Sequence, residues 1–118
     1  MRQLRFRVYI PEHEKFAYFG VGEFYEPDRY LVRDKYPVQQ WTGLADSKGI
    51  DIYEGDLLEF AYKDDGKVFV GDVQYSEKFA CFIVVVGKAF ETFSDLADYT
   101  SSFKIVGNVI ENKTKSNE

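Results

Sequence analysis

The chain has 118 residues, a length that suits one compact domain with a true hydrophobic core. Hydrophobic residues make up 45% of it and charged residues 30%, which is typical of globular proteins and excludes disorder of the whole chain. The net charge of −5 argues against a general attraction to nucleic acids or anionic lipids. The longest apolar run, Phe79 to Val86, is far shorter than the ~20 residues that a membrane span needs.

The N-terminus and the cysteine content indicate where the protein works. The first residues carry charge but are not followed by an apolar segment, so no secretory signal is expected. The chain has one cysteine, Cys81, which cannot form an internal disulfide and is typical of a reducing compartment. We therefore expect a cytoplasmic protein with no membrane association.

The N-terminal part predicts a β-hairpin. Apolar and polar side chains alternate over residues 3–10, which is the period of a half-buried strand with Arg5 and Arg7 on its solvent side. Residues 11–14 are expected to form a turn because proline cannot continue a ladder of strands. Residues 15–25 are rich in aromatic side chains and contain glycines that favour a bulge or bend, so they form the irregular return strand.

The middle of the chain changes character twice. Residues 26–51 have no strong period and are expected to form an irregular connection. After them the β pattern returns, with a hairpin turn at residues 63–67 because the Asp65-Gly66 pair suits positive φ. The expected strands cover residues 52–62, 68–75, 79–86 and 103–110.

A short helix precedes the last strand. Residues 92–99 predict one or two helical turns, with Thr92 or Ser94 as the capping residue. Phe93, Leu96 and Ala97 are expected to lie on one face of this helix. Short strands joined by tight turns, with little helix, predict a mostly β protein built on a small, strongly bent barrel.

Residues 41–58 resemble the signature of the YopX family, small proteins found mostly in phage and prophage genomes. That signature reads TGL-D--G--IYEGD, and residues 42–56 carry it in full. The resemblance is collinear over nearly the whole chain, whereas residues 23–40 match nothing specific. Supporting matches lie at residues 4–9, 71–75 and 105–112.

The resemblance implies an SH3-like barrel in a bacterial or phage cytoplasm, and it implies no reaction. Together with the residue patterns, it predicts a single domain over residues 1–112 and a disordered tail over residues 113–118. Within that domain, residues 1–40 form the N-terminal hairpin and the irregular connection, and residues 41–112 form the barrel.

Within the signature, the segment Glu54-Gly55-Asp56 favours a structural role. Gly55 permits a backbone conformation that a side chain would oppose, and Asp56 can accept hydrogen bonds from nearby amides to fix the start of a strand. Ligand contact by Glu54 and Asp56 is the alternative. Glu54 and Asp56 are also two residues apart on an expected strand, where they share a face and form a possible carboxylate pair for hydrolysis.

Other enzymatic chemistry has little support in the residue types. The one histidine, His13, lies in a polar turn, and Cys81 lies in an apolar strand where a thiol is usually inert. These two residues support neither a nucleophilic dyad nor a zinc site. The carboxylates at residues 46–56 are more typical of solvated turns than of a site for a hard cation such as Mg²⁺. We therefore expect no catalytic residues, no metal and no cofactor.

The aromatic content favours a binding role. Aromatic residues make up 18% of the chain, more than a small barrel must bury, and protein contact surfaces are rich in them. We therefore expect a non-enzymatic protein-interaction or assembly module, including self-association, with a contact surface near the irregular connection. The aromatic residues expected there are Tyr25, Tyr30, Tyr36, Trp41 and Tyr53. The alternative is that their rings fill the gap between hairpin and barrel.

Nucleic-acid binding by a small barrel is the alternative function, with Arg5, Arg7 and nearby aromatic rings as its surface. The acidic balance disfavours it, and charges on an edge strand more often discourage mispairing. A carboxylate-dependent hydrolase ranks behind both. The candidate binding residues across these alternatives are Arg5, Arg7, Trp41, Tyr53, Glu54 and Asp56.

Overall fold

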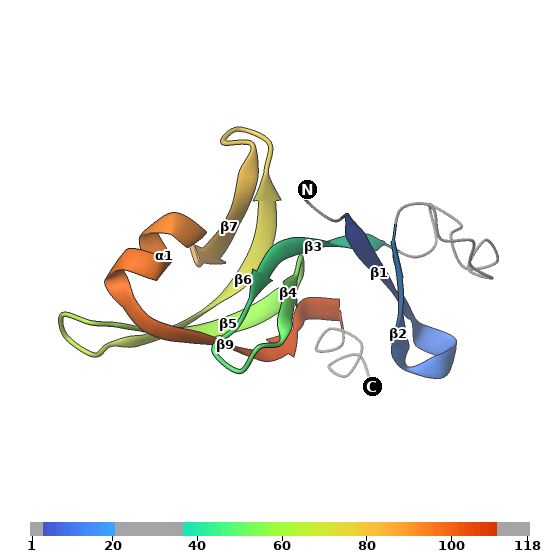
Figure 1. Ribbon diagram of the computed structural model, residues 1–118, viewed down its shortest axis with the longest axis horizontal. Helices are drawn as coiled ribbons and strands as arrows, with labels where there is room; N and C mark the ends of the chain where they lie inside the picture. Colours follow the sequence, from blue (N-terminus) through green and yellow to red (C-terminus); the bar gives the residue numbers. More distant parts are fainter. Residues whose placement is uncertain (1–3, 21–36, 111–118) are drawn as a thin grey trace.

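The computed structural model describes residues 4–20 and 37–110, which form two antiparallel β-sheets and a short α-helix (Figure 1). The first sheet has the strand order β2-β1-β3-β4, and the second has the order β8-β7-β6-β5-β9. The first sheet contains β1 (Arg5–Ile10), β2 (Lys15–Gly20), β3 (Val38–Ala45) and β4 (Asp51–Tyr53). The second contains β5 (Asp56–Tyr62), β6 (Val68–Ser76), β7 (Cys81–Val86), β8 (Ala89–Thr92) and β9 (Thr100–Asn108). The helix α1 (Phe93–Tyr99) lies between β8 and β9 in the chain.

Strands β1 and β2 form the predicted N-terminal hairpin. Their register pairs Arg5 with Gly20 at one end and Ile10 with Lys15 at the other. A single 3-10 turn, η1 (Pro11–His13), joins them. The last five residues of the predicted return strand lie outside the described residues.

Strand β3 corrects the expectation of an irregular connection. Its first residues, Val38 to Gln40, pair with β1, and its later residues, Trp41 to Ala45, pair with β4. The strand has no clear apolar alternation because polar Gln39 and Thr42 occupy two of its buried positions. Both side chains are satisfied by hydrogen bonds to distant residues, which a local pattern does not reveal.

The predicted strand over residues 52–62 is in fact two strands. The chain turns at Gly55, whose φ of +84° lies in the left-handed region that favours glycine. The turn ends β4 in the first sheet and starts β5 in the second. Because the direction changes there, residues on either side of Gly55 do not continue one alternating face.

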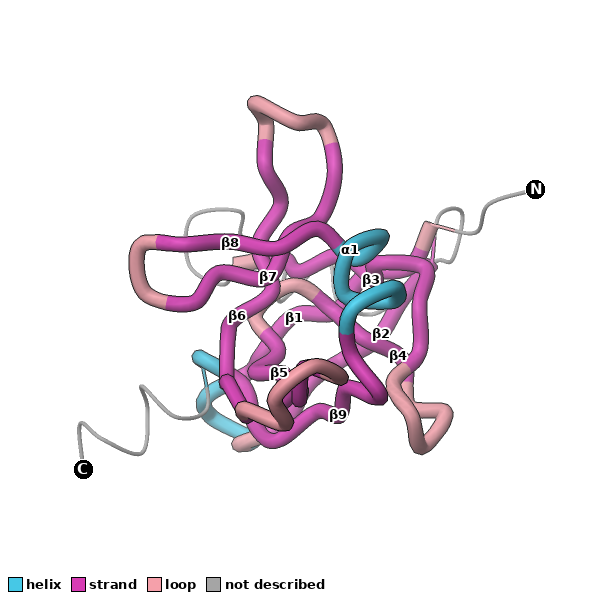
Figure 2. Tube along the Cα trace, turned by 90° about the vertical axis from the view of Figure 1, so that its left-hand side faces the viewer, coloured by secondary structure: helices cyan, strands magenta, loops and turns pink. Residues whose placement is uncertain are grey.

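The second sheet curves into a half-barrel around the hydrophobic core (Figure 2). The hairpin turn at residues 63–67 is confirmed, with Gly66 at a φ of +71° and the Lys67 amide donating to Asp65 at 3.0 Å. Strand β8 was not predicted, since it is short and its first two residues are exposed. The core cluster consists of Ile52, Leu58, Phe60, Val73, Phe82, Val84 and Leu96.

Helix α1 packs against β7, β8 and β9. Thr92 caps it as predicted, because its hydroxyl accepts a hydrogen bond from the Asp95 amide at 3.1 Å. Leu96 is fully buried and Phe93 is half-buried, but Ala97 is exposed, so the apolar face expected to carry all three is only partly covered. Consecutive helical residues lie about 100° apart, and this short helix buries only one narrow edge.

The expected fold class is confirmed: the chain is mostly β, with a small barrel-like sheet, an N-terminal hairpin and one short α-helix. None of the helical segments in the described part of the chain has the length and apolar composition needed to cross a membrane.

Candidate functional site

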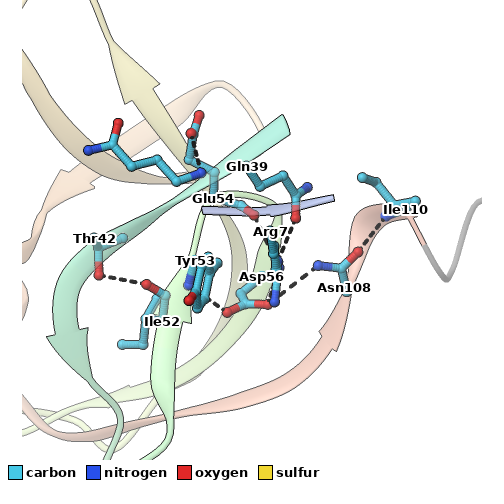
Figure 3. A network of polar contacts seen from close by, with 10 residues as sticks. Arg7, Gln39, Thr42, Ile52, Tyr53, Glu54, Asp56, Asn108 and Ile110 are labelled. Carbon is cyan, nitrogen blue, oxygen red and sulfur yellow. Dashed lines mark hydrogen bonds and ion pairs between the residues drawn. The ribbon is translucent and has the colours of Figure 1, made fainter. Parts of the chain in front are cut away.

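A buried ion pair lies where the hairpin meets the barrel (Figure 3). Arg7 on β1 donates from Nη2 to Oδ1 of Asp56 at 2.8 Å, and the two side chains are only 6% and 4% exposed. Arg7 was expected on the solvent side of an edge strand, and both parts of that expectation are wrong. Strand β1 lies between β2 and β3, and the guanidinium is covered because Asp56 compensates its charge. The local pattern does not reveal this, since Asp56 lies 49 residues away in the chain.

The Arg7 guanidinium is held from several sides. Its Nε donates to Oε1 of Gln39 at 2.8 Å, and Nη2 also donates to the Glu54 carbonyl at 3.2 Å. The rings of Phe16 and Tyr53 lie 4.2 Å and 4.7 Å from its central carbon, at distances typical of cation–π contacts. These contacts fix the plane of the guanidinium.

Asp56 is fully engaged within the protein. Its Oδ2 accepts a hydrogen bond from the Tyr53 amide at 2.8 Å, and its Oδ1 also accepts from Nδ2 of Asn108 at 3.4 Å. The predicted hydrogen bonding of Asp56 to a nearby amide at the strand start is therefore present. The carboxylate ties β4, β5 and β9 to Arg7 on β1 (Figure 3).

Gly55 makes this junction possible. A Cβ atom at this position would lie 2.1 Å from Nε2 of Gln39, so a side chain would displace a partner of Arg7. The Gly55 amide donates to the Val73 carbonyl at 2.8 Å, and its carbonyl accepts from the Val109 amide at 2.8 Å. Through these two hydrogen bonds, the turn that follows β4 of the first sheet is held to β6 and to the residue after β9.

Glu54 and Asp56 do not form the carboxylate pair suggested by their spacing. Oε1 of Glu54 accepts a hydrogen bond from the Gln40 amide at 2.8 Å, on the side away from Asp56. The two carboxylates line different cavities, because the turn at Gly55 reverses the direction in which they point. Glu54 lines a cavity of about 620 Å³ next to Cys81 and Thr92.

The larger cavity is an open groove of about 760 Å³ between the first sheet and β9. Arg5, Arg7 and Tyr18 line it from the hairpin, and Asp51 and Tyr53 line it from β4. These side chains share one face of the first sheet, since the register pairs Arg7 with Tyr18 and Arg5 with Gly20. Leu4, Ile50 and Ile105 add aliphatic surface along its rim. We refer to this cavity as the Arg5 groove.

Arg5 and Trp41 meet at the edge of the Arg5 groove. The Arg5 guanidinium lies 5.3 Å from the centre of the Trp41 ring, and the indole Nε1 donates to the Leu44 carbonyl at 3.0 Å. Arg5 also approaches Asp51 at 3.9 Å, a loose and half-exposed ion pair of small energetic value. Arg5 thus remains accessible, in contrast to Arg7.

Tyr53 forms the covered floor of the Arg5 groove. Its ring meets the Tyr18 ring edge to face at 5.6 Å. Burial, the carboxylate of Asp51 and the neighbouring Tyr18 raise the pKa of Tyr53 above its ordinary value, so its phenol is neutral at physiological pH.

A second buried carboxylate, Asp46, organises the turn after β3. It accepts hydrogen bonds from the amides of Lys48 and Ile50 at 2.9 Å each and from the Ile105 amide at 3.1 Å. Burial raises the pKa of Asp46, but the amides of Ile105, Ile50 and Lys48 and the charge of Lys48 outweigh it. The pKa of Asp46 therefore lies below its ordinary value, as suits a structural carboxylate.

The described residues do not bring together other chemistry that the sequence raised. Within residues 4–20 and 37–110, no group of three His, Cys, Asp or Glu residues is placed to hold a metal ion. Strand β7, which contains Cys81, and the turn between β1 and β2, which contains His13, lie at opposite ends of the molecule (Figure 1). Three tyrosines of the expected contact surface, Tyr25, Tyr30 and Tyr36, lie outside the described residues.

Of the six candidate binding residues, the structure gathers all but Glu54 around the Arg5 groove. Sequence reasoning missed Gln39, Asn108 and Tyr18. Gln39 lies in the segment that matched nothing, and Tyr18 was one of many aromatic residues. Asn108 lay within one of the supporting family matches, which was the one available signal for it.

Comparison with known proteins places the chain in a family. The sequence model described as YopX protein matches residues 13–114. The chain belongs to the YopX family. The resemblance seen in the signature at residues 42–56 is thereby confirmed, while residues 4–9 lie before the matched range.

The YopX fold of this chain is also similar to a solved structure. This is the crystal structure of protein EF1440 from Enterococcus faecalis, whose sequence is 18% identical to that of this chain and whose fold matches with a TM-score of 0.59. The superposition covers 93% of this chain and 95% of that one. At this identity, the likeness shows a common fold alone. No curated protein sequence matches the chain.

Proposed function

We propose that this YopX protein is a non-enzymatic protein-interaction module of a bacterial or phage cytoplasm, and that the Arg5 groove is its contact surface. One observation carries the proposal: exposed apolar and aromatic side chains meet an accessible arginine in an open cavity. Tyr18 is 49% exposed, Ile50 52% and Leu4 44%, and all three line the groove with Arg5. Tyrosine and arginine are among the residue types that contribute most to binding at protein interfaces.

The same geometry counts against nucleic acid as the partner. Of the two arginines expected to contact phosphates, Arg7 is buried and neutralised by Asp56. The remaining cation, Arg5, has Asp51 beside it. A polyanion therefore finds no excess of positive charge in the Arg5 groove, which agrees with the acidic chain as a whole.

The carboxylates also support binding over hydrolysis. Glu54 and Asp56 accept hydrogen bonds from backbone amides and line separate cavities. A general acid and a general base must face one substrate, and this pair does not.

A photo-crosslinking experiment tests the proposal. The photoreactive phenylalanine analogue benzoylphenylalanine is placed at Tyr18, in the Arg5 groove, or at Val68 on β6 as a control of similar exposure. We expect a discrete covalent adduct from position 18 in bacterial cells and none from position 68. An adduct of twice the chain mass identifies a second copy as the occupant, which supports self-association.

The partner is then purified and its affinity measured by titration calorimetry. Ile50→Asp, on the rim of the groove, should weaken binding at least about tenfold, because apolar contact is lost and a charge is desolvated. Val68→Asp should leave it unchanged. No adduct at position 18, or equal effects of the two substitutions, contradicts the proposal.

A further inference from the structure

Resting on the proposed function, we propose that the Arg5 groove binds an extended peptide segment with one acidic side chain among apolar ones, and that Arg5 and Arg7 bind that carboxylate together. Three features support this mode of binding: the guanidinium donors that the described residues leave without an acceptor, the spacing of the two arginines, and the balance of charge in the groove.

Arg7 has a donor atom, Nη1, that the described residues leave without an acceptor. Its Nε and Nη2 hydrogen-bond to Gln39, Glu54 and Asp56, whereas the described residues accept no hydrogen bond from Nη1. No buried polar side-chain atom among those residues lacks a partner, so Nη1 must reach solvent, and Arg7 lines the Arg5 groove. Nη1 is therefore the part of the guanidinium that can donate to a ligand in the groove, on a side chain that is 94% covered.

Arg5 stands at the right distance to share an acceptor with Arg7. The two residues are two apart on β1, so their side chains leave the same face about 7 Å apart. A carboxylate has two oxygens that can each meet one guanidinium. The loose contact of Arg5 with Asp51 at 3.9 Å costs little to exchange for a shorter, charge-assisted hydrogen bond.

The charges of the groove select one carboxylate over a polyanion. Arg5 and Arg7 are balanced by Asp51 and Asp56, so the empty groove has no net charge from these four side chains. One added carboxylate can accept hydrogen bonds from the guanidinium donors that the described residues leave without an acceptor. A chain of phosphates would in addition be repelled by the carboxylates of Asp51 and Asp56.

The aliphatic rim of the Arg5 groove determines which side chains should flank the acidic residue of the peptide. Leu4 and Ile50 are about half exposed, and Ile105 is partly exposed on the opposite side. In an extended peptide, neighbours on one face are two residues apart, so apolar side chains should flank the acidic one. Aliphatic residues line the groove next to Arg5, next to Asp51 and on β9, so we assign the carboxylate to a side chain within the segment, with apolar neighbours.

A peptide selection followed by calorimetry tests the inference. Random peptides displayed at the N-terminus of a phage coat protein have no free carboxyl terminus, so any selected carboxylate belongs to a side chain. We expect the peptides enriched on the intact protein to share one Asp or Glu between apolar residues. Synthetic copies with acetylated and amidated ends are then titrated into the protein.

Arg5→Gln should weaken binding of the enriched peptide about tenfold to a hundredfold, as loss of a charge-assisted hydrogen bond predicts. Changing the acidic residue of the peptide to its amide should give a similar loss, and the two changes together should cost less than their product. Lys104→Gln is the matched control. Lys104 is exposed to the same degree as Arg5 and pairs with Glu59 at 3.4 Å, but it lies outside the groove, so affinity should not change.

The outcomes separate this inference from the function on which it rests. The carboxylate part of the inference is overturned, and the interaction role kept, if Ile50→Asp weakens binding of enriched peptides that carry no acidic residue. The same holds if Ile50→Asp weakens binding but Arg5→Gln leaves it unchanged. Both the carboxylate inference and the interaction role are overturned if Ile50→Asp also leaves peptide affinity unchanged, or if the selection enriches no peptide. A short single-stranded DNA that binds more tightly than the peptide at low salt also overturns both.

Discussion

Replacing Arg7 by methionine removes a cation from a buried ion pair while keeping an apolar side chain of similar length against Phe16 and Tyr53. The carboxylate of Asp56 then stays buried with the Tyr53 amide and Asn108 as its remaining donors. Removing one partner of a buried pair costs about 3–5 kcal/mol of unfolding free energy, because the other charge is left uncompensated. That is a large part of the 5–15 kcal/mol typical of a domain.

Urea unfolding followed by circular dichroism measures the loss. At a slope of roughly 2 kcal/mol per molar urea, the midpoint of Arg7→Met should fall by about 2 M. Arg5→Met is the control, because its half-exposed pair at 3.9 Å should be worth at most about 1 kcal/mol. Asp56→Asn strands the opposite charge, and the double variant should lose less than the two single losses combined. Equal effects of Arg7→Met and Arg5→Met, or strict additivity, would refute the reasoning.

Three further predictions concern stability. Gly55→Ala should lower the free energy of unfolding in urea by at least about 2 kcal/mol, because its φ is +84° and the new Cβ clashes with Gln39. Gly49→Ala is the control: its φ is +82° but the space around it is open, so only the backbone strain of about 1 kcal/mol should be lost. The lowered pKa of Asp46 means that its contribution is present above pH ~4 and lost as pH falls through the folded-state pKa. The stability gap between the wild type and Asp46→Asn should therefore narrow from pH 6 to pH 3 (a range set by the ordinary pKa of about 4), and a constant gap contradicts the assignment. Leu96→Ala should cost about 2–5 kcal/mol by opening a cavity beneath α1, and a loss below about 1 kcal/mol would mean that the helix does not cover the core.

Local signals explain the elements that the sequence predicted well. The turn at residues 63–67 depends on Asp65 and Gly66, which act within the turn itself. The cap at Thr92 bonds an amide three residues away. Such features are determined by neighbours in the chain, so inspection of the sequence finds them.

The junction between hairpin and barrel was not predictable in the same way. Arg7 and Asp56 are 49 residues apart, and nothing near either residue shows that the other compensates its charge. Gln39 and Thr42 are buried because of Arg7 and the Ile52 carbonyl, so the strand that carries them looked irregular. Long-range polar partners change which side of a strand is covered, and the apolar pattern then gives the wrong face.

The signature itself was easier to interpret structurally than functionally. Gly55 and Asp56 act as their residue types suggest, through positive φ and amide binding. The expectation that Glu54 and Asp56 share a face is wrong, because the chain turns at Gly55 between them and the two carboxylates line different cavities. The Arg5 groove combines residues from both ends of the described chain, which only the folded arrangement of the strands brings together.

Strand β3 belongs to two partners in succession: β1 over Val38 to Gln40 and β4 from Trp41 onward. A fragment starting at Trp41 would retain every strand of the second sheet but would be deprived of Arg7 and Gln39. We therefore expect that such a fragment would not fold on its own, because Asp56 would be left buried without Arg7, and that hairpin and half-barrel melt together in one cooperative step.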